Sequence, residues 1–137
     1  MGYRRDHPSS LWAPGGKAEP GEDETDTAIR ETREETGREL ARDQLIGPVR
    51  ARFNRRGSTE RAAIFVCTTP VSGPPALTRD GRKEFTDSLD WHEWESVARN
   101  MDETRRWGFG TAFRELGSCV EKINAAARQS QTDASRE

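Results

Sequence analysis

The chain has few of the residues that mark membrane or metal–thiolate proteins. It contains two cysteines, Cys67 and Cys119, and their separation of 52 positions matches no metal-ligand spacing. We therefore expect both to be small buried hydrophobic side chains. The longest apolar run, residues 62–67, has six residues, far fewer than a membrane span or the core of a signal peptide requires. These absences predict a cytoplasmic protein with no membrane partner.

The chain also lacks an excess of apolar residues or of one charge. Hydrophobic residues make up 31% and charged residues 34% of its 137 positions, so we expect a thin core. A net charge of −2 does not favour a nucleic acid as partner. His7 and His92 have no acids or cysteines at ligand spacing, and we expect both at the surface. The length predicts one domain, placed at residues 1–128, with a disordered tail at the polar residues 129–137.

An acidic helix is predicted between the Gly15-Gly16 pair and Gly37. Gly15 and Gly16 lie in the loop before it, where the absence of side chains would let the backbone approach a metal or a phosphate. Asp23 is a suitable N-cap, and Gly37 is placed to adopt the left-handed conformation that ends a helix. This pattern predicts a helix that starts near Asp23 and stops before Gly37.

Three glutamates share one face of this predicted helix. Glu31, Glu34 and Glu35 are spaced i, i+3 and i+4, so their carboxylates are neighbours. Adjacent carboxylates repel one another unless water or a cation screens their charge, and Mg²⁺ is the usual cation. The face is therefore a candidate magnesium site.

The same stretch resembles the signature of the Nudix hydrolase family, G-x5-E-x7-R-E-U-x-E-E-x-G-U, where U is a bulky aliphatic residue. All seven fixed positions agree in type and spacing: Gly16, Glu22, Arg30, Glu31, Glu34, Glu35 and Gly37. Both U positions depart, because they hold Thr32 and Arg38. The preceding residues 11–16 resemble the W-x-P-G-G lead-in of that family. A solvated acidic helix with ordinary caps would not explain all of these offsets together.

The resemblance implies an α/β fold, an α/β/α sandwich around a mixed sheet. Strands are predicted at residues 45–53 and 61–69 and around residues 89–91, with 61–69 as the central strand and a bulge or sheet edge at Gly47-Pro48. A last helix is predicted from apolar residues that recur on one face: Phe109, Phe113, Leu116, Val120 and Ile123.

The first strand of such a domain is expected to be missing or shortened. Only eleven residues precede Trp12, and they are polar. Three explanations are open: the chain begins downstream of its true start, the sheet is one strand smaller, or a second subunit covers the sheet edge in a homodimer. We favour the first or the third of these, because an exposed apolar edge is unfavourable.

The resemblance also implies a reaction: hydrolysis of a phosphoanhydride bond in a nucleoside diphosphate linked to another moiety, by in-line attack of water on phosphorus. The metal, Mg²⁺ or alternatively Mn²⁺, would be held by Glu31, Glu34 and Glu35 with the backbone at Gly16, and Glu34 or Glu35 would orient the water. Arg30 would hold one carboxylate in its working rotamer. An ordinary surface pair between Arg30 and Glu34 is the alternative for that arginine.

Other residues have roles that the resemblance only outlines. Gly15, Glu22 and Gly37 would be structural, with Glu22 fixing the loop to the helix. Lys17 would contact substrate phosphate or simply be solvated, and Glu84, with Asp87 as second choice, would add a distal acid. The four tryptophans are expected mainly in the core, although each could stack on a base: Trp12, Trp91, Trp94 and Trp107.

Two functions remain open for a chain with these features. One is the small-molecule hydrolase, whose substrate could be a nucleoside triphosphate, a nucleotide sugar or ADP-ribose. The other is a catalytically silent Nudix domain that binds a nucleotide or a protein partner. The short first strand and the unusual Thr32 and Arg38 favour the silent domain, whereas the complete set of glutamates favours the enzyme.

Overall fold

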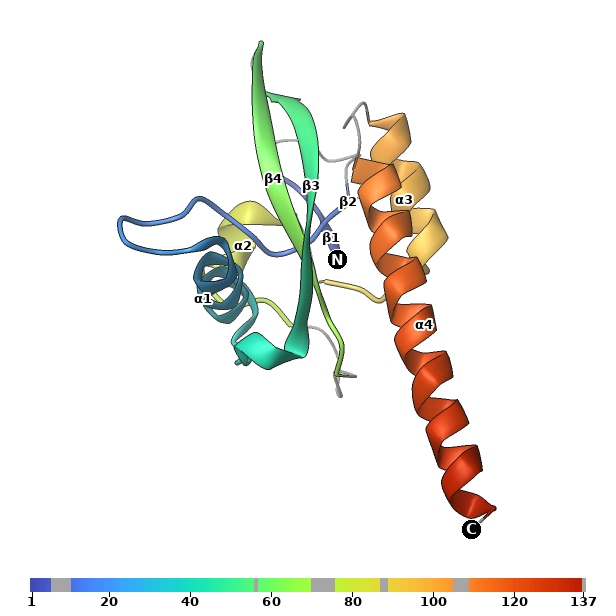
Figure 1. Cartoon of the computed structure of the whole chain (residues 1–137). Helices are drawn as coiled ribbons and strands as arrows, with labels where there is room; N and C mark the ends of the chain where they lie inside the picture. The colour runs from blue at the N-terminus through green and yellow to red at the C-terminus, as the bar shows by residue number, and fades with distance from the viewer. Residues whose placement is uncertain (6–10, 56, 70–75, 87–88, 105–108, 137) are drawn as a thin grey trace.

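The computed structural model describes residues 1–5, 11–55, 57–69, 76–86, 89–104 and 109–136, with only the backbone at residues 2–3 and 53–55. In chain order the elements are β1 (Gly2–Tyr3), β2 (Leu11–Trp12), α1 (Glu24–Thr36), the 3-10 turn η1 (Arg42–Gln44), β3 (Leu45–Arg55), β4 (Ser58–Cys67), α2 (Gly81–Glu84), α3 (Trp94–Glu103) and α4 (Phe109–Ser135). Helices α1 and α2 lie on one side of the β3–β4 hairpin, and α3 and α4 lie on the other (Figure 1). The chain therefore has the predicted α/β/α arrangement around a small sheet.

The hairpin is regular except near its start. Strands β3 and β4 pair antiparallel from Leu45 opposite Cys67 to Arg55 opposite Ser58. The register shifts between Ile46 and Val49, where Gly47-Pro48 lies, which confirms the predicted irregularity. Proline has no N–H to donate to the ladder, so the two strands cannot pair continuously there.

The prediction that residues 61–69 form a central strand was wrong for the described part of the chain. There β4 pairs with β3 alone, and its apolar residues 62–67 are only half-buried. The N-terminal strands do not extend this sheet, because β1 and β2 pair with each other, Gly2 opposite Trp12 and Tyr3 opposite Leu11. With two residues, β1 confirms that the first strand is shortened.

The strand predicted around residues 89–91 was also wrong, because this segment pairs with the N-terminal segment at one position only. The Met1 amino group donates to the Asp90 carbonyl at 2.8 Å, and the Asp90 N–H donates to the Met1 carbonyl at 2.9 Å. A separate antiparallel bridge joins Arg4 to Phe85. One paired residue fixes the course of the chain but does not make a ladder.

Helix α1 has the boundaries that its caps predict. The Asp23 side chain accepts a hydrogen bond from the Asp26 N–H at 2.7 Å, which satisfies one of the free donors at the start of the helix. Gly37 has a φ of 75°, and its N–H donates to the Arg33 carbonyl at 2.8 Å. A residue with a Cβ would be strained in that conformation, so glycine ends the helix without cost.

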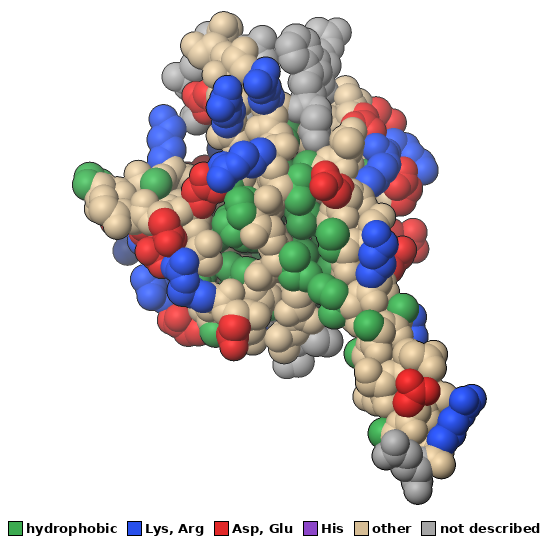
Figure 2. Space-filling model, in the orientation of Figure 1, with side chains coloured by type: hydrophobic (Ala, Val, Ile, Leu, Met, Phe, Trp, Pro, Cys, Tyr) green, Lys and Arg blue, Asp and Glu red, His purple; other side chains and the backbone are tan. Residues whose placement is uncertain are grey.

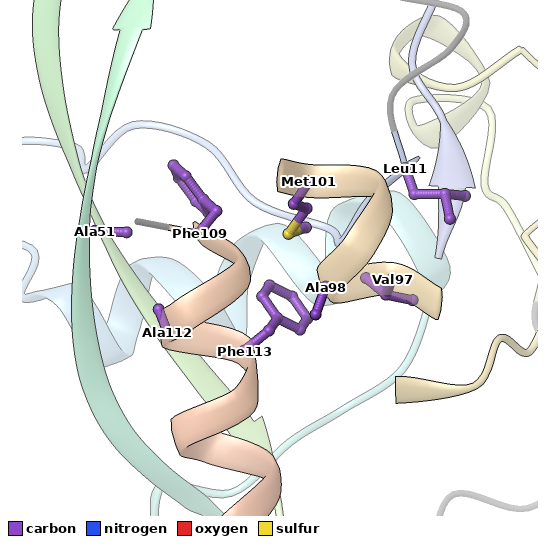
Figure 3. Close-up of a cluster of buried hydrophobic side chains, with 8 residues drawn as sticks. All are labelled: Leu11, Ala51, Val97, Ala98, Met101, Phe109, Ala112 and Phe113. Atoms are coloured by element: carbon purple, nitrogen blue, oxygen red, sulfur yellow. The ribbon is translucent and has the colours of Figure 1, made fainter. Parts of the chain in front are cut away.

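The hydrophobic core lies between the hairpin and the α3–α4 pair. Its members are three alanines and five larger apolar side chains: Leu11, Ala51, Val97, Ala98, Met101, Phe109, Ala112 and Phe113 (Figure 3). The rings of Trp12 and Phe109 have centroids 4.8 Å apart, so β2 is fastened to the start of α4. On the face shown in Figure 2, hydrophobic side chains gather where the hairpin meets α4.

Trp91 and Trp94 are more exposed than the predicted core positions would be. Trp12 is partly buried at the edge of the core. Trp91 is 65% exposed, so its prediction was wrong. Trp94 is 37% exposed, although its indole N–H donates to the Phe113 carbonyl. Trp107 lies outside the described residues. Cys67 and Cys119 are half-buried, less than the sequence indicated.

Helix α4 is longer than predicted, but the part of it that is buried is shorter than predicted. Phe109, Phe113 and Leu116 are buried as expected, but Ile123 is 44% exposed. The helix continues to Ser135, so residues 129–135, which were predicted to be disordered, are helical and exposed. The domain limit at residue 128 stays a prediction. None of the helices in the described ranges is long and apolar enough to cross a membrane.

Phe109 and Ile123 provide a matched test of where the core ends. Phe109 is fully buried, so Phe109→Ala should lower the free energy of unfolding by about 3–5 kcal/mol through lost contacts and a residual cavity. Ile123→Ala, on the same helix, should change it by less than about 0.5 kcal/mol. Urea denaturation of both variants measures the difference, and comparable losses would contradict this core.

Candidate catalytic site

The three glutamates differ in exposure although they share one face of α1. The Glu34 side chain is 43% exposed and that of Glu31 is 15% exposed, whereas Glu35 is buried at 4%. The carboxyls of Glu31 and Glu35 share a hydrogen bond, and the Gly15 N–H donates to Glu35. A Cβ at Gly16 would collide with the Glu31 carboxylate, so the loop approaches the acidic face closely.

Glu35 has an environment that opposes its ionisation. Burial, followed by the hydrogen bond and the charge of Glu31 and the charge of Glu84, raises the pKa of Glu35 to about 8. The protonated form of Glu35 is therefore favoured over the carboxylate. Its Oε2 atom is buried and has no hydrogen-bond partner among the described residues. A partnerless carboxyl oxygen beside a second carboxylate fits a cation that is bound by oxygen ligands.

Arg30 is the centre of the site's hydrogen-bond network. Its Nε and Nη2 donate to the two oxygens of Glu22 at 2.7 and 3.0 Å, and Nη2 also donates to the Lys17 carbonyl at 2.9 Å. Its Nη1 donates to Glu31 at 3.0 Å and to Glu34 at 3.1 Å. A guanidinium has five N–H donors, and all five are used here. The alternative of a simple surface pair with Glu34 fits this arrangement poorly.

Glu22 joins the preceding loop to α1. Besides Arg30, its carboxylate accepts hydrogen bonds from the Thr27 hydroxyl at 2.8 Å and the Glu19 N–H at 3.0 Å. The bonds from Arg30 first, and then the bond from the Glu19 backbone, lower the pKa of Glu22 to about 2. Glu22 therefore lies where the sequence placed a structural residue rather than a metal ligand.

Helix α2 brings Glu84 to the other end of the acidic face. The Thr78 N–H donates to the Glu35 carbonyl at 2.9 Å, and the Thr78 hydroxyl donates to the Glu34 carbonyl. Gly81 packs so closely on the Glu35 carbonyl that a Cβ would collide with it. Glu84, one turn later, is near enough for its charge to act on Glu35, as suggested for the distal acid. Asp87, the second choice, lies outside the described residues.

Some predicted site residues are not brought together. Within the described ranges, no three Asp, Glu, His or Cys side chains converge on a point that could hold a metal ion. Glu34 is directed to Arg30, and Glu35 is buried against Glu31. The Lys17 side chain is exposed, and its backbone carbonyl, not its ammonium group, is in the network. Of the three predicted metal ligands, Glu31 and Glu35 therefore lie together, and Glu34 is turned to Arg30.

The sequence did not indicate that Arg4 contacts Glu84 or that Thr78 holds the segment before Glu84 against α1. Arg4 contacts the Glu84 carboxylate at 3.3 Å across 80 positions of sequence, and Thr78 binds α1 across 44 positions. No local pattern marks such pairs. The described surface has a hollow of about 360 Å³ beside Trp94 and Arg114, away from the acidic face. A second hollow of about 420 Å³ lies beside Arg50 and Phe65, and Glu22 also lines it.

Glu22 provides a test through the pH dependence of stability. Because folding lowers its pKa from 4.5 to about 2, ionised Glu22 stabilises the fold above pH 4.5, and that stabilisation is lost as the pH falls toward 2. Glu22→Gln should be clearly less stable than the wild type at pH 7, and the gap should narrow at pH 3. Denaturation at both values measures it.

Glu19→Gln is the matched control for this measurement. The Glu19 carboxylate also lies near Arg30, but at 3.8 Å and with its side chain 65% exposed. Its substitution should have little effect at either pH, because exposed ion pairs contribute little to stability. A gap for Glu22→Gln that is the same at pH 3 and pH 7 would contradict the structural role.

Comparison with known proteins adds the family to this geometry. The family model described as NUDIX domain matches residues 2–113. No curated protein matches the chain. NUDIX enzymes in general hydrolyse pyrophosphate bonds of nucleotide derivatives and use divalent metals such as Mg²⁺. Because the match covers most of the chain, including the elements on both sides of the acidic helix, the chain belongs to the NUDIX domain family and has, in general terms, the function of a pyrophosphate-bond hydrolase.

Proposed function

We propose that this chain is a Mg²⁺-dependent hydrolase that cleaves the pyrophosphate bond of a nucleoside diphosphate linked to another moiety, by in-line attack of water. The observation that carries the proposal is the Glu31–Glu35 carboxyl pair with its partnerless buried oxygen, held beside an exposed Glu34 by one saturated arginine. A purely structural helix has no need for such a pair, because a buried carboxyl oxygen without a hydrogen-bond partner is unfavourable.

The three glutamates and the backbone near Gly16 would hold the metal, with Mn²⁺ as an alternative to Mg²⁺. When bound, the metal would neutralise negative charge on the phosphate oxygens. Oxygen donors suit either ion, and the lack of a Cβ at Gly16 leaves room for Glu31 beside the loop. Arg30 would limit the movement of Glu31 and Glu34, because it is itself fixed by Glu22.

Of the two candidates for orienting the attacking water, Glu34 is better supported than Glu35. Solvent reaches the Glu34 side chain, which is 43% exposed, whereas the Glu35 side chain is buried. Arg30 donates to the Oε2 atom of Glu34. A water that donates a hydrogen bond to the Oε1 atom of Glu34 would therefore leave the ion pair intact. A carboxylate that is partly fixed and in contact with solvent is what a water-orienting residue requires.

A catalytically silent domain that binds a nucleotide or a protein partner is the second candidate function. It is favoured by one observation: the acidic side chains of the described residues do not converge on a metal position. The two functions differ in a simple assay. Formation of the nucleoside monophosphate, the product that all of these cleavages share, should be measured for nucleoside triphosphates, nucleotide sugars and ADP-ribose, with Mg²⁺, with Mn²⁺ and with EDTA. We expect turnover of at least one nucleoside diphosphate derivative with metal and none with EDTA; no turnover of any compound would favour the silent domain.

Glu34→Gln is the sharpest variant for the proposed reaction. It keeps the size of the side chain and its hydrogen bond to Arg30 but removes the negative charge. We expect kcat to fall about 100-fold or more with a much smaller change in KM, because the lost charge acts mainly in the transition state. Glu39→Gln, which alters an exposed carboxylate after the helix, is the control and should leave kcat unchanged. Normal turnover by folded Glu34→Gln would rule out this site.

A further inference from the structure

Two of the proposed metal ligands, Glu34 and Glu35, lie in the last turn of α1. The last carbonyls of a helix have no N–H partner within it, so this turn loosens unless other groups bind them. Here the Gly37 N–H binds the Arg33 carbonyl at 2.8 Å. The next two carbonyls, those of Glu34 and Glu35, are bound by a residue from outside the helix.

Thr78 is the residue that binds both of these carbonyls. Its backbone N–H donates to the Glu35 carbonyl at 2.9 Å, and its hydroxyl donates to the Glu34 carbonyl. The hydroxyl oxygen also accepts a hydrogen bond from the Gly81 N–H at 3.1 Å. A hydroxyl can donate one hydrogen bond and accept others, so one threonine joins the end of α1 to the segment that enters α2.

The packing of Gly81 makes this junction close. A Cβ at Gly81 would collide with the Glu35 carbonyl oxygen, so a glycine is needed for the segment to approach α1 this far. Helix α2 therefore lies beside α1 (Figure 1). Glu84, the last residue of α2, is near enough for its charge to act on Glu35.

The Glu35 side chain shows why this junction matters for the site. It is 4% exposed, and its Oε2 atom has no hydrogen-bond partner among the described residues. An oxygen without a partner is kept in place by its backbone and by the groups packed around it. Ligands must lie within about 0.5 Å of their bound positions, so a backbone that is fixed beforehand favours metal binding.

We infer that Thr78 is a positioning residue, which holds the backbone of Glu34 and Glu35 in the geometry that binds the metal. This inference rests on the proposed function and gives a task to a residue far from the acidic helix in sequence. Thr78 acts through the two glutamates, in the way that outer partners of metal ligands fix the ligands themselves.

Titration of the metal-free chain with Mn²⁺ alone, followed by the paramagnetic resonance signal of the free ion, tests this inference. Thr78→Val is nearly isosteric and removes the hydroxyl while keeping the backbone N–H. We expect the Kd for Mn²⁺ to rise about 10-fold, because changes to the outer partners of metal ligands have effects of this size. Thr78→Ser, which keeps the hydroxyl, should bind Mn²⁺ as the wild type does. Wild-type affinity in Thr78→Val would overturn the inference.

Thr68→Val is the matched control, because it removes a comparable hydrogen bond. Thr68 also uses its N–H and its hydroxyl on a carbonyl of a distant segment, that of Gln44, at 2.7 and 3.2 Å. Each substitution should lower the melting temperature, but only Thr78→Val should weaken Mn²⁺ binding. Equal weakening by Thr68→Val would indicate a general loss of stability, and the inference would be wrong. Thr78→Ala, which also lacks the hydroxyl, replaces Thr78→Val if the latter does not fold.

Formation of the nucleoside monophosphate by the same variants distinguishes failure of this inference from failure of the proposed function. Mn²⁺ binding that Thr78→Val weakens, in a chain that hydrolyses nothing, would support the inference and refute the hydrolase. Hydrolysis with the same kcat and the same Mg²⁺ requirement in the wild type and Thr78→Val would refute the inference alone. A wild-type chain that neither binds Mn²⁺ nor hydrolyses a substrate would refute both.

Discussion

The ion pair between Arg30 and Glu22 is the interaction on which the arrangement of this site depends. It joins the loop that precedes α1 to the second turn of that helix through two hydrogen bonds, of 2.7 and 3.0 Å. With the loop fixed, Gly16 is held against Glu31, and the remaining donors of Arg30 reach Glu31 and Glu34. One arginine thus determines both the course of a loop and the rotamers of two acids.

The rest of the site is built by burial rather than by charge. Glu35 follows Glu34 in sequence, yet α2 covers it and leaves Glu34 in contact with solvent. Burial is also the largest cause of the raised pKa of Glu35. Residues 78–84 pack against this end of α1, mainly through contacts with the backbone carbonyls of Glu34 and Glu35.

The features that the sequence predicted are those that local rules control. The caps at Asp23 and Gly37 and the spacing of the glutamates act within a few residues, so α1 and its acidic face followed directly from the pattern. The partner of β4, the exposure of Trp91 and the contact of Arg4 with Glu84 depend on residues far apart in sequence, which no periodicity records. The helix at residues 129–135 shows the same limit, because extending a helix that is already nucleated is more favourable than starting one.

The length of α4 has a consequence for how the molecule moves in solution. At 1.5 Å per residue, its 27 residues span about 40 Å, and its last turns project from the body as a thin rod (Figure 1). A particle of this shape has more friction than a sphere of equal mass, so it diffuses and tumbles more slowly than its 15.4 kDa suggests. On a gel-filtration column a single copy would elute early, in the direction of a larger assembly.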